Sequence, residues 1–338
     1  MRVVQILGGA ENGGLEKHTI ELTHALKKQG IDVSVVAHKK FEKDFENINF
    51  IELDLSKARN NPFTLYKLQK ILNEEKFDII HTQANKATDM VIKLKPFLNS
   101  KIVSTLHNYK KNIKSFEKAD FVITVSDRIG EKLQTKNKIT IYNGIQTENI
   151  KTIDLHKKLN IESNKFIVSS VGRFVKVKNF DVLIKSIKDI DVHLVLVGDG
   201  KKRDELSNLV KTLDMEKKIT FTGMLNKTET LETIKSSNIF VITSDREGFP
   251  YTFVEALFCK TPIISTDVSD IKKIIREEHI VPFNSPEILS VKINNAKENY
   301  EKITKKFKKV FSYAQEEFSI KNMTLKNINI YKKVLNDV

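Results

Sequence analysis

The sequence predicts an α/β protein with two parallel β-sheets. Short apolar runs rich in Ile and Val alternate with amphipathic stretches of helical length, a pattern typical of parallel strands that are buried on both faces. This pattern occurs twice along the chain, with a polar break between the two series. The chain has 338 residues, whereas single hydrophobic cores stop growing at about 250–300 residues. Two domains are therefore expected.

The first βα series is expected to form a domain over residues 1–148. A helix is expected at Leu15–Gln29, because Gly30 follows it as a C-terminal stop. The polar stretch 146–165 has no strand pattern and is the expected linker. Strands are expected at Arg2–Leu7, Asp32–Ala37, Asp78–His81, Lys101–Thr105, Phe121–Val125 and Lys138–Ile141.

The second series is expected to form a domain over residues 149–315. From Ile288 the sequence is rich in Lys, Glu and Asn and reads as helical, without strands. The last helix, about 316–338, is expected to pack back on the first domain. Strands are expected at Phe166–Val171, Val192–Val197, Ile219–Phe221, Ile239–Thr243 and Pro262–Ser265.

Composition narrows the classes of protein. Cys259 is the single cysteine, so no intramolecular disulfide is expected, and no apolar run of about 18 residues suggests a membrane span. Because the first strand opens at Arg2, no signal peptide is expected, and a cytoplasmic location follows. The net charge of +14 calls for an anionic partner. Nucleic acid is not expected, since there is no Trp, arginine cluster or zinc pattern; contact with an anionic membrane is the weaker alternative to solvated lysines.

A glycine-rich loop, Gly8–Glu16, follows the first strand and opens a helix. Backbone amides and the helix dipole attract anions in that position. The loop lacks the dinucleotide fingerprint, because Ala10 stands where glycine is required, and it lacks the P-loop signature, because Leu15-Glu16 follows Gly13-Gly14. A tight turn with no ligand is the alternative.

Two basic residues follow the first strand of the second series. Gly172-Arg173 and Lys178 lie between that strand and the next helix. Arg offers bidentate hydrogen bonds and Lys a point charge, which suit a diphosphate. Ordinary surface cations are the alternative.

The segment Ile239–Thr266 carries two glutamates around a loop. The strand is followed by Glu247-Gly248-Phe249-Pro250 and a helix from about Tyr251 to Cys259, with Pro250 expected as its first residue. Glu247 and Glu255 can accept hydrogen bonds from hydroxyls. The alternatives are a helix cap for Glu247 and a solvated position for Glu255, although Glu255 lies between apolar neighbours.

In combination, these segments resemble the GT-B glycosyltransferases of family 4. The resemblance covers roughly residues 2–275, and its most specific motif is the pair of glutamates spaced as E-x7-E. It also includes Asn143-Gly144-Ile145, Leu196-Val197-Gly198-Asp199-Gly200 and Phe221-x-Gly223. It implies two Rossmann-like domains that face each other across a central cleft.

The implied activity is retaining transfer of a hexose or N-acetylhexosamine from a nucleotide-diphosphate sugar, with UDP as the nucleotide. The acceptor would be a glycan or lipid-linked precursor of a bacterial cell-surface polysaccharide, handled at the inner face of the cytoplasmic membrane. No Asp-x-Asp or other metal-ligand spacing occurs, so metal-independent transfer without a cofactor is expected. A non-catalytic nucleotide-sugar-binding protein and a nucleotide-sugar 2-epimerase of the same fold are the alternatives.

The resemblance also implies roles for single residues. His107, Arg173, Lys178 and Glu247 are the expected catalytic residues: Arg173 and Lys178 would hold the diphosphate, and His107 would contact the donor sugar near its anomeric centre. Glu247, with the amides of Gly248 and Phe249, would bind the transferred sugar, and Glu255 the ribose. The remaining expected donor-binding residues are Gly13, Gly14, Gly172, Met224, Leu225 and Pro250.

Some positions depart from the family pattern. Gln83 stands two residues after His81, at a position where the family often has a second histidine. Lys260 stands where glycine is common. Val268-Ser269-Asp270 replaces a usual Gly-Gly, and Lys272-Lys273 replaces a glutamate. The segment 107–118 is basic and amphipathic, and it is expected either to touch a membrane or to form an ordinary surface helix.

Overall fold

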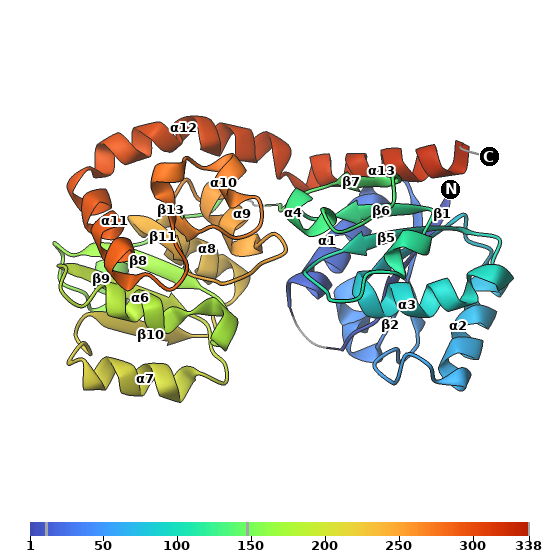
Figure 1. Cartoon of the computed structure of the whole chain (residues 1–338), viewed down its shortest axis with the longest axis horizontal. Helices are drawn as coiled ribbons and strands as arrows, with labels where there is room; N and C mark the ends of the chain where they lie inside the picture. Colours follow the sequence, from blue (N-terminus) through green and yellow to red (C-terminus); the bar gives the residue numbers. More distant parts are fainter. Residues whose placement is uncertain (11–12, 147–148, 337–338) are drawn as a thin grey trace. The chain divides into compact units, whose positions relative to one another are not determined.

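The computed structural model describes residues 1–10, 13–146 and 149–336, and it confirms the α/β class. The chain divides into two compact units (Figure 1). Unit 1 contains Met1–Ile145 together with Glu317–Val338, and unit 2 contains Gln146–Glu316. The expected domain boundary at residue 148 lies outside the described residues.

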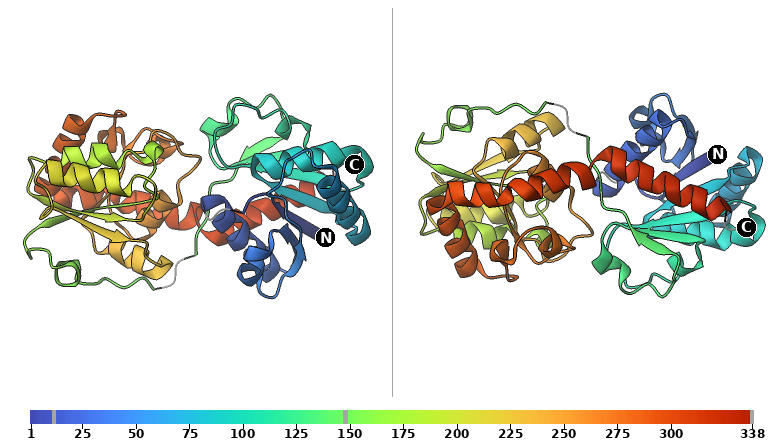
Figure 2. Two further views of the ribbon diagram at one scale, coloured as in Figure 1. Left: turned by 90° about the horizontal axis from the view of Figure 1, so that it is seen from below. Right: turned by 90° about the horizontal axis from the view of Figure 1, so that it is seen from above.

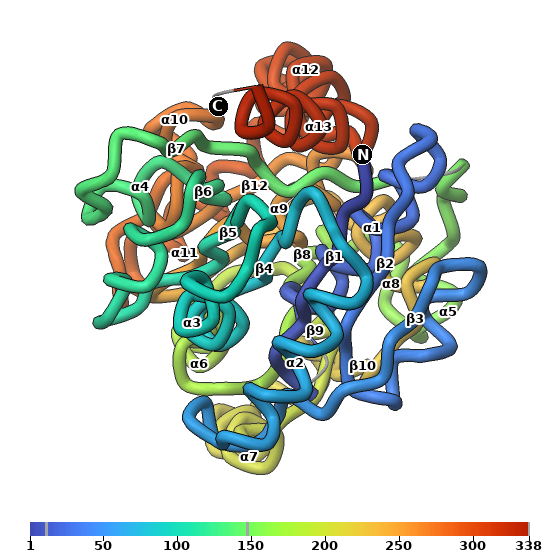
Figure 3. The backbone as a smooth tube through the Cα atoms, turned by 90° about the vertical axis from the view of Figure 1, so that its right-hand side faces the viewer, coloured from blue at the N-terminus to red at the C-terminus, as the bar shows by residue number. Residues whose placement is uncertain are grey.

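Unit 1 is built on a parallel sheet of seven strands in the order β3-β2-β1-β4-β5-β6-β7. Figure 3 shows α1 and α13 on one face of this sheet and α2 and α3 on the other. The strands are β1 Arg2–Leu7, β2 Asp32–Ala37, β3 Asn49–Glu52, β4 Ile79–Gln83, β5 Lys101–Leu106, β6 Phe121–Thr124 and β7 Lys138–Thr140. The helices are α1 Gly14–Lys28, η1 Lys39–Phe45, α2 Pro62–Glu75, α3 Ala84–Leu94, η2 Lys95–Phe97, η3 Phe116–Lys118, α4 Asp127–Gly130 and α13 Ile320–Asn336.

The helix α13 is part of the unit 1 core although it lies at the far end of the sequence (Figure 2). Its residues Met323, Ile328 and Tyr331 share one hydrophobic cluster with Val3 of β1 and Leu22 of α1. Backbone bonds between Ile145 and residues 318–320 fix the start of α13 against the end of the first segment. Unit 1 therefore needs both of its chain segments.

Unit 2 is built on a parallel sheet of six strands in the order β10-β9-β8-β11-β12-β13. Helix α6 packs against α7 and α11, and α8 packs against α9 (Figure 1). The strands are β8 Phe166–Val171, β9 Val192–Val197, β10 Ile219–Gly223, β11 Ile239–Ile242, β12 Ile263–Thr266 and β13 Ile280–Val281. The helices are α5 Leu155–Leu159, η4 Lys176–Lys178, α6 Phe180–Ser186, α7 Arg203–Thr212, α8 Lys227–Lys235, α9 Tyr251–Phe258, α10 Ile271–Ile274, η5 Glu277–His279, α11 Pro286–Glu298 and α12 Tyr300–Glu317.

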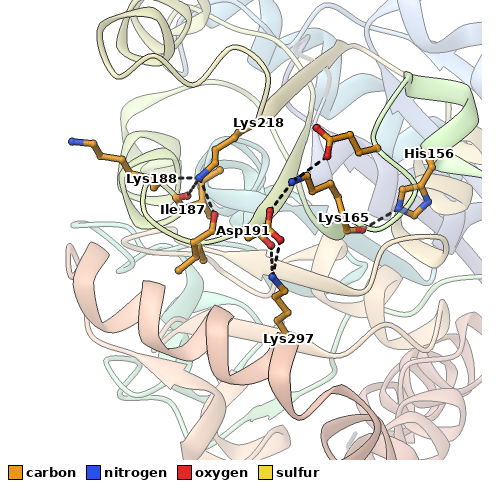
Figure 4. A network of polar contacts seen from close by, with 9 residues as sticks. His156, Lys165, Ile187, Lys188, Asp191, Lys218 and Lys297 are labelled. Atoms are coloured by element: carbon orange, nitrogen blue, oxygen red, sulfur yellow. Dashed lines mark hydrogen bonds and ion pairs between the residues drawn. The ribbon is translucent and has the colours of Figure 1, made fainter.

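A network of ion pairs and hydrogen bonds ties together the amino edge of the unit 2 sheet (Figure 4). Asp191 accepts hydrogen bonds from Lys165 at 2.7 Å and from Lys297 at 3.1 Å, and these bonds lower the pKa of its carboxyl to about 2. Lys218 Nζ donates to the carbonyls of Lys188 at 2.7 Å and Ile190 at 2.9 Å, beyond the end of α6. The lysines of this edge are therefore bound to groups within unit 2.

The structure differs from the sequence-based prediction in four places. Strands β3 and β13 were not predicted, because each is short and lies at an edge of its sheet, where an apolar run is not required. The expected linker contains α5, whose Leu155 is buried in a unit 2 cluster. The segment 107–118 is irregular up to η3 rather than an amphipathic helix. Asn108 and Asn112 there accept bonds from the amides of Tyr109 and Lys114, which compete with helical hydrogen bonds.

Both sheets reverse their strand order at one point. In unit 1 the reversal lies between β1 and β4, and in unit 2 it lies between β8 and β11. Ligands of open α/β sheets bind beyond the carboxyl ends of the strands at such a switch point. The loops that follow these four strands are therefore the places to look for a site.

Candidate functional site

The unit 2 switch point holds an ion pair between two residues that the sequence placed in a donor site. Lys178 lies at the end of η4, after β8, and Glu247 lies in the loop after β11. Lys178 Nζ donates to Glu247 Oε1 at 2.6 Å. The side chains are only 21% and 16% exposed, so a charged group of each sign is held at the carboxyl edge of the sheet.

Backbone contacts hold the two loops that carry this pair. The amide of Asp245 donates to the carbonyl of Val177 at 2.9 Å, and Thr243 Oγ1 donates to the carbonyl of Lys178 at 2.8 Å. Asn179, in the left-handed region at φ 49°, donates to the carbonyl of Thr243 and to the carboxylate of Asp245. These bonds hold the backbone of Lys178 and the backbone of the Glu247 loop at a fixed separation.

Glycines let the loop after β9 approach the loop after β8. Gly198 has φ 130°, and a Cβ on it would lie 2.1 Å from the carbonyl oxygen of Gly172. Gly200 has φ 152°, and its Cβ would lie 2.7 Å from the carbonyl oxygen of Phe174. No other residue fits either position without moving the backbone that leads to Arg173.

Glu255 is buried on α9, with 6% of its surface exposed, which rules out the solvated alternative. Pro250 is the N-cap of α9 rather than its first helical residue, and its backbone is extended at φ −71° and ψ 128°. Its carbonyl accepts the first helical bond from Phe253, as an N-cap carbonyl does. Phe249 is buried against Phe253, with ring centroids 5.8 Å apart.

Ser269 is a site-adjacent residue whose role the sequence did not reveal. It is buried at φ 53°, and its hydroxyl donates to the carbonyl of Gly248. A glycine is the usual residue at positive φ, so a serine in place of Gly-Gly was the signal of a side-chain contact. The next residue, Asp270, is buried and pairs with Lys273 at 3.3 Å. Of the departures after α9, Ser269 therefore supports the Glu247 loop.

The other expected donor-binding residues of unit 2 lie in loops after neighbouring strands. Gly172 follows β8, and its amide donates to the carbonyl of Val197 at 3.0 Å. Arg173 is exposed. Met224 is 73% exposed after β10, and Leu225 packs in part against a unit 2 core cluster. Among the predicted residues of unit 2, the structure brings Lys178 and Glu247 into direct contact.

The remaining expected site residues belong to unit 1. Gly13 is the N-cap of α1 and Gly14 its first residue, both exposed; Glu11 and Asn12 of the same loop lie outside the described residues. His107 follows β5 and is half-buried. Its Nε2 is 2.7 Å from Oε1 of Gln83, and its ring packs edge-on against the ring of His18 at 4.6 Å.

His107 adjoins a set of buried polar residues whose mutual contacts the sequence did not reveal. They come from β1, β4, β5 and α13, and all are at most 1% exposed. These residues are Gln5, His81, Gln83, Thr105 and Tyr331. Together with His107 they are called the polar network. Burial lowers the pKa of His81 to about 3 and that of His18 to about 4, and it holds the pKa of His107 well below its usual value. The three imidazoles are therefore neutral at pH 7.

The described residues contain no group of three or more His, Cys, Asp or Glu side chains arranged to hold a metal ion. Within the same ranges, no helix has the length and apolar character needed to cross a membrane.

Two family models match the chain. The model described as Glycosyl transferases group 1 matches residues 151–315, and the model described as Glycosyltransferase Family 4 matches residues 12–149. The O-antigen biosynthesis glycosyltransferase WclY of Escherichia coli is 24% identical over 292 residues, which cover 78% of this chain and 81% of WclY.

Solved structures of glycosyltransferases match the fold over the whole chain. A glycosyltransferase from Rickettsia africae superposes with a TM-score of 0.87 at 21% identity, covering 100% of this chain and 99% of that one. HepE of Anabaena, solved in complex with UDP-glucose, gives a TM-score of 0.83 at 18% identity, with 100% of both chains covered. The fold is therefore GT-B, and the chain belongs to the group 1 glycosyltransferases of the family 4 type.

Proposed function

We propose that this glycosyltransferase transfers a hexose or N-acetylhexosamine from a UDP-sugar with retention of anomeric configuration and without a metal ion. The observation that carries the proposal is the Lys178–Glu247 pair at the unit 2 switch point. A cation there suits the diphosphate, and a carboxylate suits the hydroxyls of the sugar. The complex of HepE with UDP-glucose supports a UDP-sugar as the donor class.

The proposed chemistry is a front-side attack by the acceptor hydroxyl on the anomeric carbon, on the face that the diphosphate leaves. The bond to the diphosphate oxygen breaks while the bond to the acceptor oxygen forms, and the leaving diphosphate takes the acceptor proton. Arg173 and Lys178 would stabilise the negative charge that develops on the leaving group, the role that a divalent ion has in other transferases. Glu247 would hold the sugar, Glu255 the ribose hydroxyls, and His107 a sugar hydroxyl.

We further propose a glycan or lipid-linked acceptor in the biosynthesis of lipopolysaccharide or another bacterial surface polysaccharide. Support comes from the similarity to WclY, which acts in O-antigen biosynthesis. The net charge of +14 supports peripheral contact with the anionic inner face of the cytoplasmic membrane. Sedimentation with vesicles that contain or lack an anionic phospholipid tests this contact, and equal binding to both would contradict it.

The donor is best identified by a thermal-shift panel of UDP-, GDP- and ADP-sugars, because a bound donor raises the apparent stability. The best donor is then used in transfer or hydrolysis assays with and without EDTA, and proton NMR of the product gives the anomeric configuration. Activity is expected to survive EDTA and to fall in Glu247→Ala and Arg173→Ala. Full activity in both variants would refute the site, and an inverted product would refute retention.

A further inference from the structure

The polar network lies on one face of the unit 1 sheet. Gln5 pairs with His81 in register, and Gln83 pairs with Thr105. Because side chains alternate between the faces of a strand, these residues point to the face that α1 and α13 cover. His107, two residues beyond Thr105, continues this row at the carboxyl edge.

Hydrogen bonds run through the network to His107. Tyr331 OH is 2.6 Å from Nδ1 of His81 and accepts a bond from Gln5 Nε2 at 3.3 Å. Gln83 Nε2 donates to Gln5 Oε1 at 2.7 Å. The amide of Gln83 therefore turns its carbonyl oxygen toward His107 Nε2, at 2.7 Å.

This polarity determines where His107 carries its proton. A carbonyl oxygen only accepts hydrogen bonds, so Nε2 must carry the hydrogen and Nδ1 keeps its lone pair. No hydrogen bond joins Nδ1 to another described residue. Because Gln5 and Gln83 are buried, turning one amide without the other would leave two acceptors or two donors facing each other between them, which costs about 1–3 kcal/mol per unsatisfied group.

We propose that Gln83 is a positioning residue that holds His107 as the Nε2–H tautomer, so that Nδ1 is presented as an acceptor for a hydroxyl of the donor sugar. This proposal rests on the proposed function for the identity of the ligand. The proposal also accounts for the glutamine at position 83, two residues after His81, where the family often has histidine. A glutamine can donate to Gln5 and accept from His107 at the same time, and its amide does not titrate near neutral pH.

The tautomer can be measured without any substrate. Long-range proton–nitrogen NMR of the full-length, ¹⁵N-labelled protein distinguishes protonated from unprotonated ring nitrogens, and the signals of His107 are those lost in His107→Gln. The expected result is a protonated Nε2 and an unprotonated Nδ1. Protonation at Nδ1 instead would overturn the proposal, because it requires the opposite polarity of the whole network.

Variants separate positioning from general damage to strand β4. Gln83→Met removes the acceptor and should give a mixture of both His107 tautomers. Gln83→Glu keeps an acceptor at Nε2, so it should keep the Nε2–H form, and its carboxylate should raise the pKa of the His107 imidazole. The matched control is Thr82→Val on the opposite face of β4, where Thr82 Oγ1 is bonded to Thr88 and Ser104 at 2.8 and 2.7 Å. An unchanged tautomer in Gln83→Met would overturn the proposal.

Turnover gives the second readout. With UDP-glucose as the donor, Gln83→Met should lower kcat/KM roughly 10-fold, the effect of losing one oriented hydrogen bond, and Thr82→Val should change it less than about 2-fold. Equal losses in both variants would overturn the positioning role. If the wild type processes no nucleotide sugar in the donor panel, the proposed function fails, and the NMR result still decides the tautomer.

Discussion

Replacing Glu247 by glutamine is expected to tighten the binding of UDP while slowing transfer. In the free protein the Lys178 ammonium is held by the Glu247 carboxylate at 2.6 Å. A diphosphate oxygen that binds Lys178 must compete with that carboxylate and also approach its negative charge. Glutamine is nearly the same size and removes the charge, so Lys178 becomes available to the phosphate.

The size of the effect follows from the geometry of the pair. Two unit charges about 4 Å apart interact by about 4 kcal/mol at the effective dielectric constant of a protein surface. A charge-assisted hydrogen bond contributes about 1.5–3 kcal/mol after desolvation. If the free Lys178 of the variant binds UDP about 1 kcal/mol more strongly than the paired Lys178 does, the Kd for UDP falls about 5-fold. Transfer should fall at least about 10-fold, because a neutral amide is a weaker acceptor for sugar hydroxyls than a carboxylate.

Isothermal titration calorimetry with UDP measures the first effect, and initial rates with the identified donor measure the second. Lys178→Met should weaken UDP binding about 10-fold or more. Glu162→Gln is the matched control, since Glu162 pairs with Lys165 at 3.3 Å before β8, at the opposite edge of the sheet. Weaker or unchanged UDP binding in Glu247→Gln would refute this account of the pair.

Three further predictions concern stability. The pKa values of His18, His81 and His107 lie below 6.5 in the folded state, so the unfolded chain binds more protons below that pH. The free energy of unfolding should be highest above pH about 6.5. It should fall toward pH 5 by up to about 1.4 kcal/mol per pH unit for each histidine, as measured by urea titrations followed by circular dichroism. Lys260→Gly should raise the free energy of unfolding by about 0.5–1 kcal/mol, because Lys260 has φ 59° after α9; calorimetry measures it. Lys218→Met should lower it by about 2 kcal/mol through lost carbonyl contacts, and it should leave UDP binding unchanged.

Each of these predictions has a contradicting outcome. Stability that does not change between pH 5 and 7 would show that the buried histidines become protonated without cost. If Lys260→Gly is less stable than the wild type, the contacts of the lysine side chain contribute more free energy than the removal of backbone strain at this position. Weaker UDP binding in Lys218→Met would show that the amino edge of the sheet communicates with the site.

Apart from β3 and β13, the strands and the loops that follow them were predictable because they depend on local patterns. Buried parallel strands give apolar runs such as Val192–Val197, and the end of each run marks the loop where a ligand binds in this class of fold. The types of residue at the unit 2 site, cations after β8 and a glutamate after β11, could be read in the same way.

The contacts at the site could not be predicted in this manner. Lys178 and Glu247 are 69 residues apart, and only the strand order brings them together. Gln5 and His81 lie inside runs that look like ordinary buried strands, so nothing in the spacing sets them apart. Their partner Tyr331 comes from α13, and the choice of a partner so distant in sequence depends on the packing of the whole unit.

The two-segment composition of unit 1 has a consequence for how the protein is made. During synthesis, residues 1–145 leave the ribosome before the whole of unit 2, and α13 follows only after it. At about 5–20 residues per second, the strands of unit 1 wait roughly 10–40 s for the helix that covers Leu22 and completes the bonds of His81. Unit 2, which is continuous in sequence, has all its residues during that interval. The nascent first segment therefore exposes an apolar sheet face that a chaperone can bind, and the order of maturation runs opposite to the order of synthesis.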